Sequence, residues 1–387
     1  MAIQYIDRRH SDCSKWDGLR EVFGEDDLQA MWVADMDFRC PDCVIEKIRK
    51  YTDFGVFGYY RPRDSYLEAF LDWEKLQHGY TVKKDWVRFA PGVVPAFNWL
   101  VQILTEPGDA VIVQTPVYYP FLNAVRNNGR ELVCSDLVDT EGVYTIDFVD
   151  FEKKIAEHHV KLFILSSPHN PVSRVWNREE LRTMLEICRR YGVFILSDEI
   201  HQDFVFAGNR HIPSALAGDY DDLLVTLTAA TKTFNLAGCQ NSFVVIPCKE
   251  IREKFDRFTE NIQIRGGNPF GYLAVEAAYR EGLPWLEEVR SAIYENYRYA
   301  SKTLLEAFPK LVISPLEGTY LMWIDFGAYL RPEELMDFFQ KRCRLAFDYG
   351  DWFGGKRFGT HVRMNLATSG EMIKEAVSRM IRALAEG

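Results

Sequence analysis

Thr231-Lys232-Thr233-Phe234-Asn235-Leu236-Ala237-Gly238 is the stretch on which the fold prediction depends, because its lysine follows an apolar run almost directly. That run, Leu223–Leu227, has the composition of a strand buried on both faces of a sheet. Two other apolar runs also lead into polar residues: Val193–Ser197 precedes Asp198, and Val160–Ser166 precedes Asn170. A lysine, an aspartate and an asparagine therefore each lie just past a separate predicted strand.

Strand-like and helix-like segments alternate from Trp86 onward, which predicts an α/β fold with a mainly parallel sheet covered by helices. Asn177–Tyr191 is the clearest predicted helix, since its apolar residues recur at helical spacing and Asn177 is followed by Glu180 three residues later. The seven predicted strands are Trp86–Ala90, Ala110–Gln114, Glu131–Ser135, Val160–Ser166, Val193–Ser197, Leu223–Leu227 and Ser242–Ile246.

The pattern changes after Gly282, where a long charged helix is predicted over Pro284–Phe308. Beyond it the sequence mixes strands with helices, which predicts a smaller α+β domain. We expect a large domain over residues 46–283 and a small domain made of residues 1–45 and 284–387. The elements predicted in the C-terminal part are the strands Tyr320–Ile324 and Val362–Asn365 and the helices Pro332–Lys341 and Gly370–Leu384.

Composition excludes several classes of protein. The 387 residues carry a net charge of −10, so no basic field is available for nucleic acid. No segment approaches the roughly 18 apolar residues of a membrane span, and the N-terminus has no signal-peptide core. Eight scattered cysteines indicate reduced thiols and a cytoplasmic location. Cys40 and Cys43 form a CxxC motif without a second pair at zinc spacing, so we expect two ordinary thiols rather than a metal or redox site.

Ligands of open α/β sheets bind beyond the carboxyl ends of the strands, where these polar residues converge. Lys232 could form a Schiff base with an aldehyde, Asp198 could keep a ring nitrogen protonated, and Asn170 could donate to a ring oxygen. A cofactor with all three groups is pyridoxal 5′-phosphate (PLP), which the sequence therefore predicts. The alternatives are a helix cap for Asp198 and turn chemistry for Asn170. His201 could face the same ring oxygen or be an ordinary satisfied histidine.

Other residues complete the predicted cofactor site. Tyr118 could stack on the ring, although the neighbouring Tyr119 competes for that role and core packing is the alternative. The phosphate requires backbone donors at a helix N-terminus, which Val93 and Val94 supply after the turn at Gly92. The hydroxyl of Thr231 can add a further donor.

Arg363 lies in the strand-like run His361–Asn365 of the C-terminal region. An arginine fork matches the α-carboxylate of an amino acid, so we expect Arg363 to bind the substrate. The alternative is an ordinary surface ion pair.

With these motifs, the chain resembles a fold-type I PLP enzyme of the class I/II aminotransferase superfamily. Within that superfamily it is most similar to the cystathionine beta-lyase (C–S lyase) branch of the MalY/PatB type. The resemblance covers nearly the whole chain. Its markers are residues 31–38 (MWVADMDF), 57–59 (FGY), 91–94 (PGVV), 168–171 (PHNP), 198–201 (DEIH) and 232–238.

The resemblance implies a homodimer with two active sites at the subunit interface, in which Tyr59 reaches the phosphate of the partner's cofactor. It also implies β-elimination from a sulfur amino acid such as L-cystathionine, which releases a thiol, pyruvate and ammonia. An aminotransferase acting on an aromatic or sulfur amino acid is the alternative, because it uses the same residues. A regulatory protein that binds a partner through this fold is a third and weaker hypothesis.

The chain departs from the superfamily pattern at two positions. Ser173 stands where the turn after Asn170 often has glycine. Gln240 stands where many aminotransferases carry an arginine on the phosphate, which removes a charge-assisted contact and favours the lyase branch.

Overall fold

A seven-stranded sheet forms the centre of the computed structural model, which describes residues 3–385. Its strand order is β2-β10-β9-β8-β7-β3-β4, and β10 alone runs antiparallel to its neighbours. All seven predicted strands are confirmed, with ends shifted by at most two residues. The strands are β2 (Val87–Ala90), β3 (Ala110–Thr115), β4 (Glu131–Asp136), β7 (Leu162–Ser166), β8 (Phe194–Asp198), β9 (Leu224–Thr228) and β10 (Ser242–Val245).

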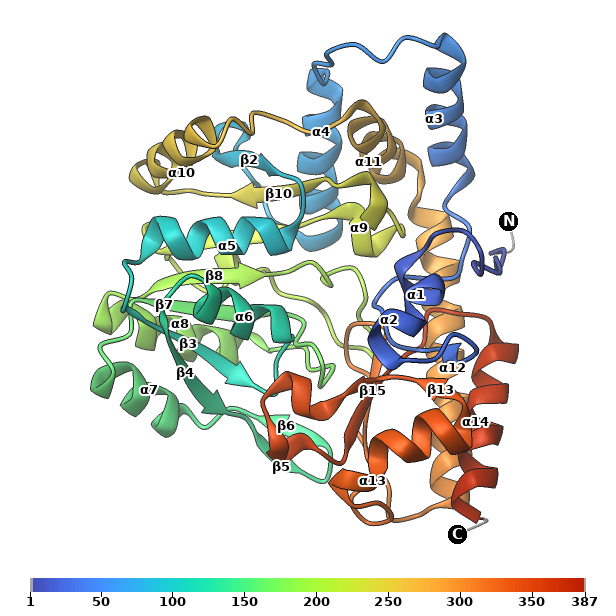
Figure 1. The fold of residues 1–387 in the computed structure, drawn as a ribbon. Coiled ribbons are helices and arrows are strands. Elements are labelled where there is room, and N and C mark those ends of the chain that lie inside the picture. The colour runs from blue at the N-terminus through green and yellow to red at the C-terminus, as the bar shows by residue number, and fades with distance from the viewer. Residues whose placement is uncertain (1–2, 386–387) are drawn as a thin grey trace.

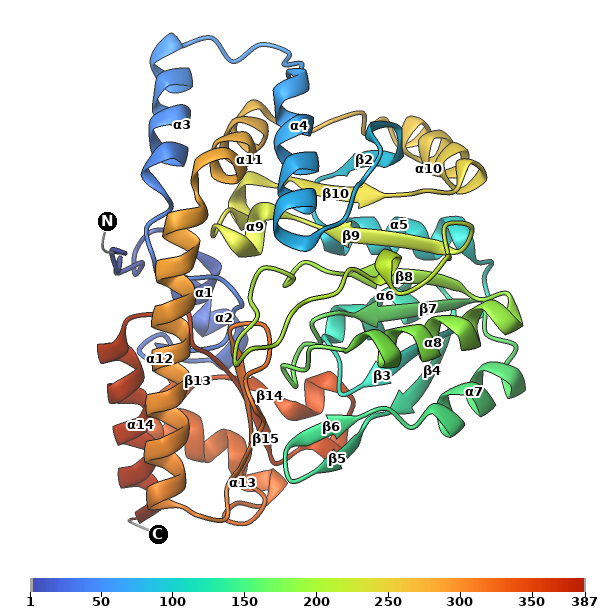
Figure 2. The ribbon, with the colours of Figure 1, turned by 180° about the vertical axis from the view of Figure 1, so that it is seen from behind.

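Helices cover both faces of this sheet, which explains why β3, β7 and β9 are buried along their whole length. α5 (Val93–Leu104) and α6 (Tyr119–Asn127) lie on the face nearer the viewer in Figure 1, and α10 (Lys249–Asn261) packs against α5. α7 (Phe148–Glu157) and α8 (Arg178–Tyr191) cover the opposite face, seen in Figure 2. The predicted start of α8 is confirmed, since Asn177 and Glu180 form a capping box.

The C-terminal region contains an antiparallel sheet with the order β11-β12-β15-β14. The predicted helix over Pro332–Lys341 is α-helical only to Asp337 and continues as a π-helical segment, Phe338–Cys343. The elements are α12 (Leu283–Ala307), β11 (Val312–Ile313), β12 (Leu321–Asp325), α13 (Pro332–Asp337), β13 (Leu345–Ala346), β14 (Asp348–Tyr349), β15 (His361–Asn365) and α14 (Gly370–Ala385).

The N-terminal segment joins this region, because β1 (Gln29–Ala30) pairs in parallel with β13. α12 begins near α11, which lies within residues 46–283, and packs along α14, as Figure 2 shows. The pairing agrees with the proposed division into residues 46–283 and residues 1–45 with 284–387, which we retain as a proposal.

A loop between two helices projects from the top of the molecule in Figure 1. These helices, α3 (Asp42–Phe54) and α4 (Asp64–Trp73), both pack against α11 (Pro269–Glu281), whereas residues 55–59 between them are exposed. The remaining elements are α1 (Ser14–Asp17), α2 (Leu19–Phe23), α9 (Ala230–Thr233), the hairpin β5 (Val138–Thr140) and β6 (Val143–Thr145), a π-helical segment Glu74–His78, and short 3₁₀ turns.

Within residues 3–385, none of the helices combines the length and apolar character needed to cross a bilayer. All eight cysteines are free. The thiol of Cys40 donates to the carbonyl of Asn235 at 3.5 Å, and that of Cys43 donates to the carbonyl of Ala277 at 3.6 Å. Burial raises the pKa of Cys40 to about 11, so this thiol is protonated and unreactive at neutral pH.

Candidate active site at the carboxyl edge of the large sheet

A cavity lies past the carboxyl ends of β3, β7, β8 and β9, the edge that the sequence predicts. Its lining combines one lysine, one carboxylate, one histidine and one amide with the start of α5. Eight of the ten predicted site residues line it: Val93, Val94, Tyr118, Asn170, Asp198, His201, Thr231 and Lys232. Arg363 and Tyr59 do not.

Lys232 projects into this cavity from α9, four residues after β9 ends. Its amine donates a 2.5 Å hydrogen bond to the backbone carbonyl of Ala34, a residue 198 positions away in the sequence. Burial lowers the pKa of Lys232 to about 8, with the positive charge of Arg363 acting in the same direction against the attraction of Asp35 and Asp198. A large fraction of the amine is therefore neutral near pH 8, as a base or nucleophile requires.

Asp198 is the last residue of β8, so it lies within the strand end rather than after it. Burial raises its pKa to about 7, while the backbone N–H of Ile200, which donates at 3.1 Å, and the nearby Lys232 oppose the shift. Within residues 3–385, that N–H is the only hydrogen-bond donor to this carboxylate. No helix follows Asp198, so the helix-cap alternative is wrong.

The turn after β7 holds Asn170 against the C-terminal region. Arg363 Nη1 donates to Asn170 Oδ1 at 2.9 Å, and the backbone N–H of Tyr118 donates to the Asn170 carbonyl at 3.0 Å. Ser173 adopts the left-handed conformation (φ 61°) that glycine usually occupies. Its hydroxyl donates to the carbonyl of Leu321 at 2.5 Å, a contact that helps stabilise this conformation.

Tyr118 and His201 lie on the walls of the cavity, whereas Tyr119 packs against Trp352 and Phe353. Burial, reinforced by the nearby Lys232, holds the pKa of His201 well below its usual range, so the ring is neutral. Its Nδ1 is buried and has no hydrogen-bond partner among residues 3–385.

The phosphate end predicted from the sequence lies at the N-terminus of α5. Gly92 is extended there and no side chain caps the helix. Val93 and Val94 are the first two residues of the helix, so their backbone N–H groups are free donors, and Pro95 after them has no N–H. Thr231 lines the same cavity, while Gln240 is exposed and lies outside its lining.

Arg363 on β15 is 2% exposed, which excludes the surface ion pair considered as its alternative. Its Nη2 pairs with Asp348 and also donates to the carbonyl of Trp32 at 3.3 Å, while Nε is buried without a partner in the described chain. Asp348 was not anticipated from sequence, because a single aspartate in a short strand carries no distinctive pattern.

Residues 31–38, called here the strap, carried only a family resemblance in the sequence, yet Ala34 of this segment lines the cavity and contacts Lys232. The carbonyl of Ala34 accepts from both Lys232 and the hydroxyl of Tyr320, the latter at 2.7 Å. The side-chain amide of Asn365 donates to the carbonyls on either side, those of Val33 and Asp35, at 2.6 Å each. These contacts fix the orientation of the Ala34 carbonyl.

Asn235 ties the strap to the loop of Lys232. Its amide nitrogen donates to the carbonyls of Met36 and Phe38 at 2.9 and 3.1 Å, and its Oδ1 accepts from the N–H of Met36 at 3.0 Å. The lysine loop and the strap therefore form one hydrogen-bonded unit.

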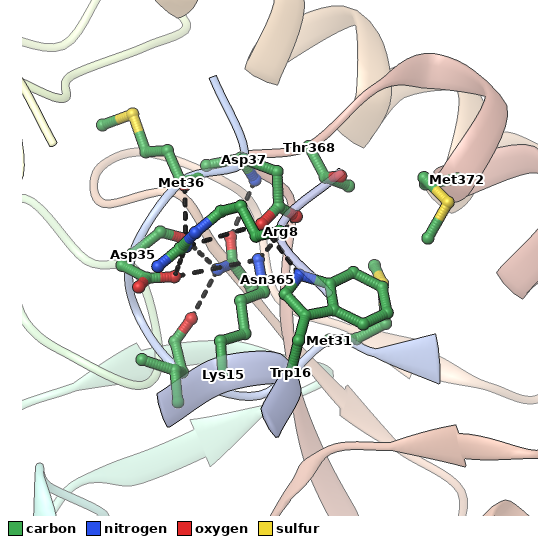
Figure 3. Close-up of polar contacts among 12 residues, drawn as sticks. Arg8, Lys15, Trp16, Met31, Asp35, Met36, Asp37, Asn365, Thr368 and Met372 are labelled. Carbon is green, nitrogen blue, oxygen red and sulfur yellow. Dashed lines mark hydrogen bonds and ion pairs between the residues drawn. The ribbon is translucent and has the colours of Figure 1, made fainter. Parts of the chain in front are cut away.

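Buried charges anchor the strap from the other side, as Figure 3 shows. Asp37 accepts from the amine of Lys15 at 2.8 Å and from the indole N–H of Trp16 at 3.1 Å. Arg8 lies 2.8 Å from Asp35. Lys15 and Asp37 are each 1% exposed, so this ion pair is shielded from solvent and salt.

The polar groups that line the cavity fit the predicted cofactor PLP. They include the neutral ring of His201, the carboxylate of Asp198 and the free N–H groups of Val93 and Val94. A phosphate would satisfy the helix N–H groups, and a protonated ring nitrogen would pair with Asp198. Lys232 is the residue that could bond to the aldehyde.

Comparison with known proteins agrees with this geometry. The family model described as aminotransferase class I and II matches residues 31–380, so the chain belongs to that family. The cystathionine beta-lyase PatB of Bacillus subtilis is 40% identical over 374 residues, covering 96% of both chains.

Two solved structures share the fold over nearly their whole length. A PLP-bound putative aminotransferase from Clostridium difficile has a TM-score of 0.96 and 39% identity, covering 98% of both chains. Cystalysin from Treponema denticola, which contains PLP, has a TM-score of 0.95 and 34% identity, covering 100% of this chain and 99% of its own. The fold and the family expected from the sequence are thus confirmed.

Replacing Asp37 by alanine should destabilise the protein by about 3–5 kcal/mol, because Lys15 would remain buried without its close carboxylate partner. Asp7→Ala, which breaks the exposed pair with Arg9, is the matched control and should cost less than about 1 kcal/mol. Urea unfolding of both variants measures the difference. Equal losses would contradict the importance of the buried pair.

Asp198→Asn should stabilise the cofactor-free protein above pH 7. The pKa of Asp198 is raised in the folded state, so folding stability is lost as pH rises from about 4, where the unfolded carboxyl ionises, to about 7. Asparagine removes this loss, and the gain should be near zero at pH 4 and on the order of 1–3 kcal/mol at pH 8. Urea unfolding at both pH values tests this, and a gain independent of pH would refute it.

Proposed function

We propose that this protein is a PLP-dependent carbon–sulfur β-lyase, which cleaves L-cystathionine or a related sulfur amino acid into a thiol, pyruvate and ammonia with consumption of water. The observation that carries the proposal is the single cavity shared by the amine of Lys232, the carboxylate of Asp198, the amide of Asn170 and the N-terminus of α5. Membership of the family and the 40% identity to a cystathionine beta-lyase support it.

Each side chain has a defined task in this proposal. PLP, when bound, withdraws electrons from the substrate and so makes its Cα proton acidic. Lys232 holds the cofactor and then, as a free amine, removes that proton, a role for which a pKa of about 8 is suitable. Asp198 would hold the ring nitrogen, Asn170 and His201 would hold the ring oxygen, and Tyr118 would pack on the ring.

Substrate orientation is assigned to Arg363, whose fork would hold the α-carboxylate. Asn170 and Asp348 bind two of its nitrogens and so orient the guanidinium. The phosphate would be held by the N–H groups of Val93 and Val94 and by the hydroxyl of Thr231. With Gln240 in place of an arginine, these neutral donors carry more of the phosphate affinity.

We also propose that the enzyme is a homodimer, in which Tyr59 completes the phosphate site of the partner subunit. Tyr59 is fully exposed and lies outside the cavity of its own chain. Phe54 and Phe57 nearby are 70% and 57% exposed, and such a group of apolar side chains is typical of an interface. A cytoplasmic location is part of the same proposal, supported by the eight free cysteines.

An aminotransferase is the second candidate, because it would use the same groups. Its reaction differs in requiring a 2-oxo acid as amino acceptor, whereas the lyase needs none. The name of the Clostridium difficile protein favours this alternative, and that of PatB favours the lyase.

The purified enzyme with bound PLP should release pyruvate from L-cystathionine without any added 2-oxo acid. Lys232→Ala should reduce this rate by a factor of about 10³ or more and remove the visible absorbance of the lysine-bound cofactor. Lys249→Ala, which alters an exposed lysine, should leave both unchanged. Turnover only with a 2-oxo acid would establish the aminotransferase instead, and an active Lys232→Ala variant would exclude both.

Mixed dimers test the role of Tyr59. Tyr59→Ala and Lys232→Ala chains, each impaired alone, should regain activity when unfolded together and refolded, because a mixed dimer then contains one intact site. Random pairing makes half of the dimers mixed, so about a quarter of the wild-type activity is expected. If Tyr59 acts within its own subunit, the mixture will show no recovery.

A further inference from the structure

A second pocket lies apart from the Lys232 cavity and shares no lining residue with it. It has a volume of about 210 Å³ and is formed by the end of the helical segment after α4, the 202–211 segment and α12. Its polar lining consists mainly of nitrogen donors, namely Gln77, His78, Gln202, Arg210, His211 and Arg290. None of its lining residues is an aspartate or a glutamate, although the whole chain has a net charge of −10.

Within residues 3–385, neither arginine of this pocket forms an ion pair or a side-chain hydrogen bond with a carboxylate. The Nε of Arg290 donates to the backbone carbonyl of Asp203 at 2.5 Å, and Arg290 is half-buried. Arg210 is exposed, and none of the hydrogen bonds or ion pairs of the described chain involves it. Burial lowers the pKa of Arg290 despite the attraction of Asp203 and Glu287, and an anion in the pocket would offset this cost of burial.

Two carboxylates behind the pocket, those of Asp203 and Glu199, accept hydrogen bonds from other side chains rather than from these arginines, although Asp203 attracts Arg290 electrostatically. Asp203 accepts from His78 Nε2 at 2.8 Å, from the hydroxyl of Thr233 at 2.6 Å and from the indole of Trp73 at 3.1 Å. Its pKa is lowered by these contacts and by Arg290 despite its burial.

Glu199 is occupied in the same manner. It accepts from His211 Nε2 at 3.0 Å, from the hydroxyl of Ser197 at 2.9 Å and from the backbone N–H of Ser214 at 2.9 Å. The carboxylates behind the pocket therefore have hydrogen-bond partners, whereas cationic and amide side chains line the pocket wall.

His211 provides independent evidence that this pocket binds a ligand. The side chain is 4% exposed and lines the pocket, and its Nδ1 has no hydrogen-bond partner in the described chain. Because Glu199 holds the opposite nitrogen, Nδ1 is the ring atom left free to bond a ligand in the pocket.

We propose that this pocket binds a small phosphate, either free or as the phosphate group of a small metabolite. The forks of Arg210 and Arg290 would bind its oxygens, and Nδ1 of His211 and the amide of Gln77 would form hydrogen bonds with the phosphate as well. Arg290 would connect the bound phosphate to Asp203, which in turn accepts from the hydroxyl of Thr233, the residue after Lys232. This site is independent of the reaction proposed above.

Calorimetric titration of the PLP-loaded enzyme with inorganic phosphate, at ionic strength held constant with KCl, tests the proposal. The bound cofactor occupies the first cavity, so its phosphate site cannot contribute. We expect saturable binding of one phosphate per chain, weakened about tenfold by Arg210→Gln, which equals a loss of about 1.4 kcal/mol. Arg257→Gln, at an exposed arginine of α10, is the matched control and should bind as the wild type does.

Histidine NMR adds a readout at the site itself. Phosphate should shift the ring resonances of His211 in the wild type, and this shift should be lost in Arg210→Gln, whose exposed side chain has no partner needed for folding. Glycerol 3-phosphate distinguishes the two sources: tighter binding than phosphate indicates a phosphorylated metabolite, and weaker binding indicates the free ion. Absence of saturable binding, or equal weakening by Arg210→Gln and Arg257→Gln, would overturn the proposal.

Discussion

Two groups that prefer opposite charges, the amine of Lys232 and the carboxylate of Asp198, are buried in the same cavity, and much of the surrounding structure serves this constraint. Burial alone would neutralise both, since it lowers the pKa of the amine and raises that of the carboxyl. Each also moderates the shift of the other, so both groups titrate near neutral pH. A site with such pKa values can accept and return a proton near neutral pH, whereas a solvated lysine and a solvated aspartate titrate far from it.

The strap at residues 31–38 contributes Ala34 to the wall of this cavity. One of its carbonyls, that of Ala34, receives the amine of Lys232, and the amides of Asn235 and Asn365 hold the backbone on either side. The strap is anchored in turn by the ion pair between Lys15 and Asp37. Such a pair contributes little to overall stability compared with apolar packing, but it requires one geometry and so favours one position of the strap.

Much of the fold could be predicted from the sequence. The seven strands were found from apolar runs, and the start of α8 from Asn177 and Glu180, because such patterns depend on neighbouring residues. The convergence of Asp198, Asn170 and Lys232 followed from the rule that ligands lie at the carboxyl edge of such sheets. The roles of Ala34 and Asn365 could not be predicted in this way. A backbone carbonyl has no sequence signature, and an asparagine in a strand has no pattern that reveals its partner.

The sequence by itself determined which segments become strands and helices, and which reactive side chains stand at their ends. Only the tertiary structure decided what those side chains touch. The partners of Lys232 and Arg363 lie 198 and 193 residues away, at Ala34 and Asn170, and no local periodicity encodes such distances. These contacts arise when the N-terminal segment, the large sheet and the C-terminal sheet pack together, since only that packing excludes water from the groups and makes their mutual hydrogen bonds necessary.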